Sequence, residues 1–298
     1  MSVYDVNGDA LTSAYSMNGN SLNYAYDVSG DVVFTKSGVD YSNYSFVQKW
    51  ASKGIANTQG FDIYDGKVFW VSKSGNSTRD ANCYVWNLSD GSQALDNQYI
   101  TIYSGHGNNL SFDFPTLYAT SGYTPHAYVN TLTNDFVATL SRILYLNDGS
   151  KDCDACIDDK NKSMLWSLGH NSSDTTSNPV DYNISKWNLT SLTENSDETY
   201  TPEKIKTITT PRPTCYYFQG CKVHDGILWY ASGYASTAAY VYGVSTRTGE
   251  VLYTIDCNTT TEIEGISWVA DADAVGGYAL YVGFQGMMLR KYTFAELT

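Results

Sequence analysis

Charged residues are scarce in this chain of 298 residues, and positive charge is the scarcer sign. Asp, Glu, Lys and Arg together make up 16% of the sequence, against about 25% in an average globular chain. The 18 Lys and Arg residues face 31 Asp and Glu residues, so the formal net charge at pH 7 is −13. Because nucleic-acid binding needs a basic surface to neutralise phosphates, this balance argues against a nucleic-acid partner.

Long apolar runs and cysteines are also few. No stretch approaches the roughly 18 consecutive apolar residues of a membrane-spanning helix, so we expect no membrane span. Residues 1–5 show neither the basic nor the apolar segment of a secretory signal. Six cysteines are too few for a disulfide scaffold. Cys153 and Cys156 have the gap of a zinc or redox pair, but no second pair follows, so neither a metal nor another cofactor is expected.

Tyrosine and glycine are abundant instead, with 26 and 24 residues. Aromatic residues make up 14% of the chain, whereas a disordered chain is poor in aromatics and rich in charge. Together with frequent Asn, Ser and Thr, this composition is typical of an all-β protein with a polar, mostly uncharged surface.

The first part of the chain contains a short repeat. Residues 3–11, 14–22 and 25–33 each place Asn-Gly or Ser-Gly between two short apolar runs, a pattern that predicts tight hairpins. Units of this size cannot bury a core alone. We therefore expect residues 1–38 to form a small β arm for attachment or homo-oligomerisation, or a surface β-meander that packs on the main domain.

A longer period follows in residues 39–298. Residues 59–64, the turn Asp65-Gly66 and residues 67–72 read as strand, turn and strand, and the layout returns around Asp225-Gly226. Similar units begin at residues 59, 106, 154, 219 and 264. Four short strands in every 40–50 residues or so are the signature of a β-propeller blade, so the sequence predicts a five-bladed β-propeller.

The last unit has room for only three strands before the chain ends. An incomplete blade would leave an open sheet edge, which proteins avoid by pairing or covering it. Residues 44–50 alternate suitably and directly precede the first unit. We expect them to form the outer strand of the last blade and so close the propeller.

The first residue of each inner strand lies near one mouth of a propeller channel, so residues far apart in sequence converge there. Tyrosines in loops at the same end suit sugar rings, because they offer a flat apolar face and a polar group. Alternatively, the polar residues only hydrogen-bond backbone groups around a water-filled channel. The candidate ligand-binding residues are Gln59, His106, Asn108, Tyr123, His126, Asp154, Gln219, Tyr234 and Glu264.

Catalytic signatures are weak. The sequence has neither a G-x-S-x-G nucleophile motif nor a phosphate-binding P-loop. A glycosidase would need two carboxylates about 5–10 Å apart, for which Asp62, Asp154, Glu262 and Glu264 are the candidates. No catalytic residue is assigned, and an enzyme remains the alternative to a binding protein. The acidic groups favour a neutral or zwitterionic glycan over a polyanion.

The sequence resembles the phage receptor-binding-protein and teichoic acid biosynthesis protein C-like β-propeller family at three short segments, residues 59–61, 70–72 and 104–109. The resemblance covers about residues 40–298, and the N-terminal repeats resemble segments of prophage-encoded surface proteins. It implies five blades and recognition of a cell-wall glycopolymer at the tail tip of phages of Gram-positive hosts. Unlike the tail proteins, this chain has no long helical stem.

Three functions follow as expectations. The first is a non-catalytic module that binds carbohydrate or cell-wall glycopolymer, as a phage or prophage receptor-binding protein. The alternatives are a glycoside hydrolase or lyase on the same fold, and a protein-interaction scaffold. The expected location is extracellular or on the virion without a secretory signal, or cytoplasmic if the protein does not come from a phage.

Overall fold

The computed structural model describes short strands at 3–4, 10–11, 24–26 and 32–35, and then residues 39–73, 80–171, 180–213 and 217–297. In these residues the regular elements are β-strands, apart from one 3₁₀ turn, η1 (Val275–Gly277). The structure thus confirms the all-β prediction. No helix of the described residues is long and apolar enough to cross a membrane.

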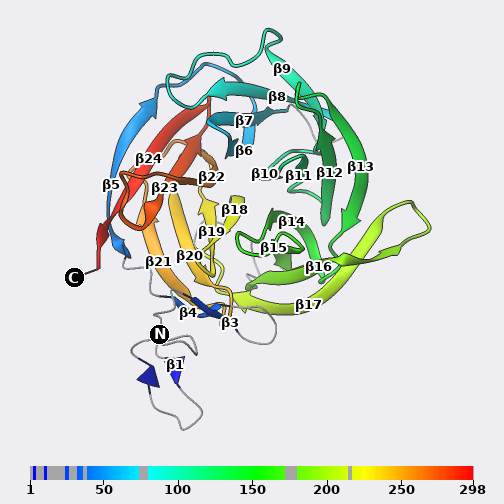
Figure 1. Cartoon of the computed structure of the whole chain (residues 1–298), viewed down its shortest axis with the longest axis vertical. Coiled ribbons are helices and arrows are strands. Elements are labelled where there is room, and N and C mark those ends of the chain that lie inside the picture. The colour runs from blue at the N-terminus through cyan, green and yellow to red at the C-terminus, as the bar shows by residue number, and fades with distance from the viewer. Residues whose placement is uncertain are drawn as a thin grey trace, which may run out of the picture.

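Four larger sheets lie around a common centre (Figure 1). Twelve of their strands are β5 (Val39–Trp50), β6 (Thr58–Tyr64), β7 (Lys67–Ser72), β8 (Asp80–Asn87), β9 (Tyr99–Tyr103), β18 (Phe218–His224), β19 (Ile227–Ser232), β20 (Tyr240–Ser245), β21 (Val251–Asp256), β22 (Ile263–Ala270), β23 (Tyr278–Phe284) and β24 (Met288–Glu296). They form three four-stranded sheets in the orders β6-β7-β8-β9, β18-β19-β20-β21 and β22-β23-β24-β5.

The fourth large sheet has eight strands. These are β10 (Asn109–Asp113), β11 (Thr116–Thr120), β12 (His126–Leu132), β13 (Ala138–Tyr145), β14 (Ser150–Ile157), β15 (Met164–Asn171), β16 (Tyr182–Glu194) and β17 (Tyr200–Thr210). Their order is β10-β11-β12-β13-β17-β16-β15-β14. Its two halves meet where β13 and β17 run parallel and pair only at Leu144 and Tyr200.

The strands β6, β10, β14, β18 and β22 lie closest to the centre and contact one another in a closed ring (Figure 1). Because each of these strands opens an antiparallel hairpin or meander, their first residues lie at one end of the ring and their last residues at the other. This arrangement is propeller-like. It brings together residues that are far apart in the sequence, as the repeat predicted.

The tight turns inferred from Asp-Gly pairs are confirmed. Asp65 and Gly66 have φ angles of 48° and 67°, and Tyr64 pairs with Lys67 across the turn. The Asp225-Gly226 turn repeats this geometry, with φ angles of 53° and 70°. Positive φ at both central residues matches the twist of an antiparallel hairpin, and Asp and Gly tolerate it best.

The predicted closure is also confirmed. Strand β5 pairs antiparallel with β24, and Phe46 lies opposite Tyr292. Tyr41, at the start of β5, is buried and makes edge-on ring contacts with Trp229 and Phe294, each at 5.1 Å between centroids. Its hydroxyl donates to Asp225 Oδ2 at 3.0 Å. The chain therefore anchors its own last sheet with a strand that precedes the first one.

Apolar side chains fill the space between neighbouring sheets. Two of the buried tryptophans also donate a hydrogen bond to a buried side chain. Trp187 Nε1 donates to Ser167 Oγ at 2.8 Å, and Trp166 Nε1 donates to Asp158 Oδ2 at 2.8 Å. Near the axis the backbones approach closely. A Cβ atom on Gly60 would lie 2.3 Å from the carbonyl oxygen of Asn108, which explains why glycine follows Gln59.

The N-terminal segment contains two antiparallel strand pairs, one at the ends of the first repeat unit and one that overlaps the third. Strand β1 (Val3–Tyr4) pairs with β2 (Ala10–Leu11), and β3 (Tyr24–Tyr26) pairs with β4 (Val32–Thr35). The middle unit, residues 14–22, lies outside the described residues. An attachment or oligomerisation role for residues 1–38 stays a prediction.

Candidate functional site

A cavity of about 390 Å³, here called the mouth cavity, opens at the end of the ring where the inner strands begin. Seven candidate residues from the sequence line it: Gln59, His106, Asn108, Tyr123, Gln219, Tyr234 and Glu264. They come from the beginnings of β6, β18 and β22, from the segment before β10, and from loops that follow second strands. The structure thus brings together residues that can be more than half the chain apart in the sequence.

Two candidate residues lie elsewhere. His126 begins β12, stacks on Tyr145 with 5.3 Å between ring centroids, and lines a different cavity beside Asp197. The loop before β12 points Tyr123 to the mouth, but three residues later the chain has turned outward into the third strand of its sheet. His126 therefore does not join the mouth cavity.

Asp154 lies in the middle of β14 and is fully buried, not at the mouth. Its Oδ1 accepts from Thr120 Oγ1 at 3.0 Å, and its Oδ2 accepts from the Gly220 amide at 2.6 Å. Burial raises the pKa of Asp154 to about 7. Because both oxygens bond to neighbouring strands, Asp154 holds the inner ring together instead of facing a ligand.

Several residues that line the mouth cavity were not among the candidates from the sequence, including Asp152, Tyr217 and Phe218. The pairing of β14 with β15 shifts register between Ser150 and Asp152, as in a β-bulge. No pattern in the sequence predicts this bulge. Tyr217 directly precedes β18, so its position before an inner strand is a signal that was available.

Three tyrosines form the rim of the mouth cavity. Tyr123, Tyr217 and Tyr234 are 52%, 46% and 47% exposed. The rings of Tyr217 and Tyr234 lie 4.8 Å apart, and His106 meets Tyr123 edge-on at 4.6 Å. These rings are held in place by neighbours but remain half open to solvent. They offer aromatic faces to a ligand that enters the cavity.

Two glutamates approach the cavity from the beginning of β22. Glu264 is 1% exposed, its Oε1 accepts from Thr58 Oγ1 at 3.4 Å, and its Oε2 has no hydrogen-bond partner among the described residues. Burial, and next the charge of Glu262, raise the pKa of Glu264 well above its usual value. Glu262 Oε1 accepts from Gln219 Nε2 at 3.1 Å, and burial raises the pKa of Glu262 as well.

A histidine and a carboxylate form a fixed pair on another wall. Nδ1 of His170 lies 2.7 Å from Asp152 Oδ1, which also accepts from the His170 backbone amide at 3.2 Å. The imidazole stacks on Phe218 with 4.5 Å between ring centroids. None of the described residues that line the mouth cavity is Lys or Arg. The cavity therefore combines aromatic faces, neutral amides and three acidic side chains.

A second cavity, of about 250 Å³, lies at the opposite end of the ring, where the inner strands end. There Lys222 Nζ lies 2.7 Å from Asp62 Oδ2. Asp62 also accepts from the Phe112 amide at 2.9 Å and from Ser267 Oγ at 2.6 Å. Asp62 thus joins β6 to β10, β18 and β22. Its oxygens are occupied by structural bonds, which removes it from the candidate catalytic carboxylates.

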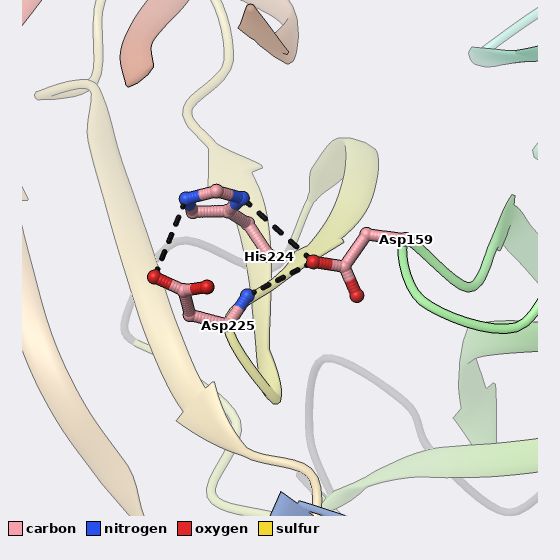
Figure 2. A group of neighbouring side chains, drawn as sticks. All are labelled: Asp159, His224 and Asp225. Carbon is pink, nitrogen blue, oxygen red and sulfur yellow. Dashed lines mark hydrogen bonds and ion pairs between the residues drawn. The ribbon is translucent and has the colours of Figure 1, made fainter. Parts of the chain in front are cut away.

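Asp159, His224 and Asp225 gather beside this second cavity (Figure 2). His224 Nδ1 lies 3.8 Å from Asp159 Oδ2, while His224 Nε2 lies 3.5 Å from Asp225 Oδ2. The two carboxylates therefore flank different ring nitrogens, whereas one metal ion would bind a single nitrogen of the imidazole. The ammonium group of Lys160 lies 3.5 Å from Asp159 and 3.8 Å from Asp225, so a cation already balances these acids. The geometry fits a charge network and not a one-ion site.

Cys153 and Cys156 do not form a metal or redox pair. They are three residues apart on β14, so they point to opposite faces of the sheet. Cys153 packs in one apolar cluster with Trp187, and Cys156 packs in another with Trp166. Burial raises the pKa of the Cys153 thiol well above its usual value. Both side chains act as small core residues.

No protein-family model matches the chain, and no curated protein matches its sequence. Solved structures do match: glutaminyl cyclase of Myxococcus xanthus has a TM-score of 0.56 at 11% identity, over 86% of this chain and 97% of that one. The tail fibre of Staphylococcus aureus phage P68 has a TM-score of 0.50 at 15% identity, over 89% of this chain and 54% of the fibre. The WD40 β-propeller domain of Doa1 has a TM-score of 0.41 at 11% identity, over 84% of this chain and 97% of that domain.

The chain thus spans about half the length of the tail fibre. At these identities the likenesses show the fold alone. They agree with the radial arrangement of sheets, and the names of the matched proteins show varied functions.

Proposed function

We propose that residues 39–298 form a five-bladed propeller and that residues 1–38 are a separate arm. The eight-stranded sheet counts as two blades, since its halves join only through the Leu144–Tyr200 pair between outer strands. The closed ring of β6, β10, β14, β18 and β22 supports one inner strand for each blade.

We infer that the mouth cavity binds carbohydrate or a cell-wall glycopolymer without cleaving it. The single observation that carries this proposal is the half-exposed rim of Tyr123, Tyr217 and Tyr234 over a polar floor. Sugar rings stack on aromatic faces through their C–H groups, while their hydroxyls exchange hydrogen bonds with amides and carboxylates. Gln59 and Gln219 supply such amides on two inner strands.

The sequence resemblance extends this proposal to a phage or prophage receptor-binding protein. In that role the protein sits on the virion or at a cell surface, and the N-terminal arm attaches it or joins copies of the chain. The propeller-like fold is one that a phage tail fibre also has. A protein-interaction scaffold is the alternative without a glycan.

A glycan array tests the binding proposal. We expect the intact chain to bind a subset of glycans, and Gln59→Ala combined with Gln219→Ala to abolish binding while the far-ultraviolet circular dichroism stays unchanged. Gln98→Ala is the matched control, because Gln98 is exposed and outside the mouth cavity. Undiminished binding by the double variant would move the site to the sides of the propeller or to the arm.

A glycoside hydrolase is the second candidate, and Glu264 is the observation that favours it. A buried carboxyl with a raised pKa, next to a second carboxylate, is the arrangement that lets a glycosidase keep its general acid protonated. Incubation of the array hits with the protein, followed by a reducing-end assay, separates the two functions. We expect no turnover; turnover that Glu264→Gln abolishes would establish the enzyme instead.

A further inference from the structure

The mouth cavity is rich in acidic side chains. Asp152, Glu262 and Glu264 line it from β14 and the beginning of β22, and none of the described lining residues is Lys or Arg. Asp152 is paired with His170, and Glu262 accepts from the neutral amide of Gln219. Neither glutamate therefore has a Lys or Arg partner in the cavity lining.

Two buried acceptor atoms in the same cavity have no hydrogen-bond donor among the described residues. They are Glu264 Oε2, on a side chain that is 1% exposed, and Asn108 Oδ1, on a side chain that is 9% exposed. Leaving a buried acceptor without a hydrogen-bond donor is unfavourable. A ligand that brings donors recovers this cost, and an ammonium group brings three donors and a positive charge.

The rim adds a second attraction for a cation. Tyr123, Tyr217 and Tyr234 surround the opening, and the negative faces of aromatic rings attract ammonium groups within about 6 Å. Burial raises the pKa of Tyr123, and the charges of Tyr217, Tyr234, Glu262 and Asp152 add to this effect. All five residues line the same cavity.

A bare metal ion fits less well than an organic cation. In the part of the chain that the structure describes, the group of three ligand side chains that converge within 4.8 Å lies at the other end of the ring, at Asp159, His224 and Asp225. The acids of the mouth cavity do not converge in this way. Acceptors that are spread over a cavity suit a ligand that holds its charge and its hydroxyls several ångströms apart.

We propose that the mouth cavity selects a sugar that bears a protonated amine, with the ammonium group against Glu262 and Glu264 and the tyrosine rim around it. This inference rests on the proposed carbohydrate binding and names the chemical class of the ligand. A polyanionic glycopolymer without amines is then excluded by the same two glutamates.

The inference carries a pH dependence. Both glutamates have a raised pKa, and an adjacent ammonium group favours their ionised forms, so binding releases protons and strengthens as the pH rises. Thr58 and Gln219 face them as neutral hydrogen-bond donors. The other histidine and aspartate side chains that line the cavity are His106, before β10, His170, on β15, and Asp152, on β14.

Isothermal titration with two matched sugars tests the charge. Methyl 6-amino-6-deoxyglucoside and methyl glucoside differ only in an ammonium group and a hydroxyl at neutral pH. We expect the amino sugar to bind about tenfold more tightly, as a charge-assisted hydrogen bond and a cation–π contact together allow. Glu262→Gln combined with Glu264→Gln should remove this preference, because the amides keep the shape and lose the charge, and Gln98→Ala should retain it.

Equal binding of the two sugars would overturn the charge inference and leave carbohydrate binding intact. A lack of binding by both at tens of millimolar would overturn it too, and the glycan array then judges carbohydrate binding separately. A preference that survives the replacement of both glutamates by Gln would place the ammonium group elsewhere and contradict the assignment.

Discussion

Phe46, near the beginning of the described chain, lies directly opposite Tyr292 in the last strand, with 5.2 Å between the two ring centroids. The pairing makes the final sheet depend on a strand that is 246 residues earlier in the sequence, the difference between positions 292 and 46. A ring of sheets closed in this way has no free edge at the junction, so the stability of the whole ring depends on β5.

Tyr41 tests this closure. We expect Tyr41→Ala to lower the free energy of unfolding by about 3–5 kcal/mol, because the buried ring loses its contacts with Trp229 and Phe294. Urea denaturation measures the loss. Phe46→Ala is the control, because Phe46 is 40% exposed and should cost much less. Equal losses would mean that β5 is not anchored through Tyr41.

Gly60 tests the close approach of the inner strands. Gly60→Ala would place a Cβ atom 2.3 Å from the Asn108 carbonyl oxygen. This oxygen belongs to the backbone, which cannot move away without a large loss of stability. We expect a loss of about 3 kcal/mol or more, or no folded protein. Gly66→Ala meets nothing within 4 Å and should cost about 1 kcal/mol for its positive φ alone. Thermal unfolding that ranks the two variants in the opposite order would contradict the packing described.

The third prediction concerns how much the buried Asp62–Lys222 ion pair contributes to stability. Lys222→Met leaves the Asp62 charge unpaired among four inner strands, which should cost about 3–5 kcal/mol. Lys67→Met breaks the exposed pair with Asp65, whose atoms are 3.7 Å apart, and should cost under about 1 kcal/mol. Chemical denaturation at constant pH compares them, and similar costs would show that Asp62 is solvated.

His224 predicts a pH dependence of stability. Burial lowers its pKa from 6.5 to about 4, so the unfolded chain binds more protons between these values. Stability should therefore fall as the pH drops through this window. Asp154, with its pKa raised to about 7, acts in the opposite sense. We therefore compare the pH profile of the intact chain with that of His224→Gln. As the pH drops through this window, the free energy of unfolding of the variant should decrease by up to about 3 kcal/mol less than that of the intact chain. Parallel pH profiles would show that folding does not change the pKa of His224.

The fold could be predicted because its signals are local. The Asp65-Gly66 and Asp225-Gly226 turns require residues that tolerate positive φ, and the alternating runs beside them specify strands. The closure by β5 followed from counting strands in the last unit. The polar stretch of residues 193–202 lies at the end of the long strand β16, in the turn after it, and at the beginning of β17. Local propensity does not show how far a hairpin extends.

The site could be predicted only where a residue's position in the repeat determines its place. Gln59, Gln219 and Glu264 begin inner strands, and all three line the mouth cavity. Asp154 occupied a similar position in the pattern, but β14 begins four residues earlier, at Ser150, which places Asp154 inside the ring. Asp152 reaches the cavity through a register shift that depends on β15. Such placements come from tertiary pairing, which a single sequence does not display.

The most direct test of the account is the affinity of the best array glycan for Tyr123→Ala, measured by isothermal titration against the intact chain. Tyr99→Ala is the control, because Tyr99 lies on β9 with 42% of its side chain exposed and outside the mouth cavity. We expect a loss of about tenfold or more for Tyr123→Ala, the size of one aromatic stacking contact, and no change for Tyr99→Ala. An unchanged affinity in Tyr123→Ala, with the fold intact, would contradict the assignment of the mouth cavity as the glycan site.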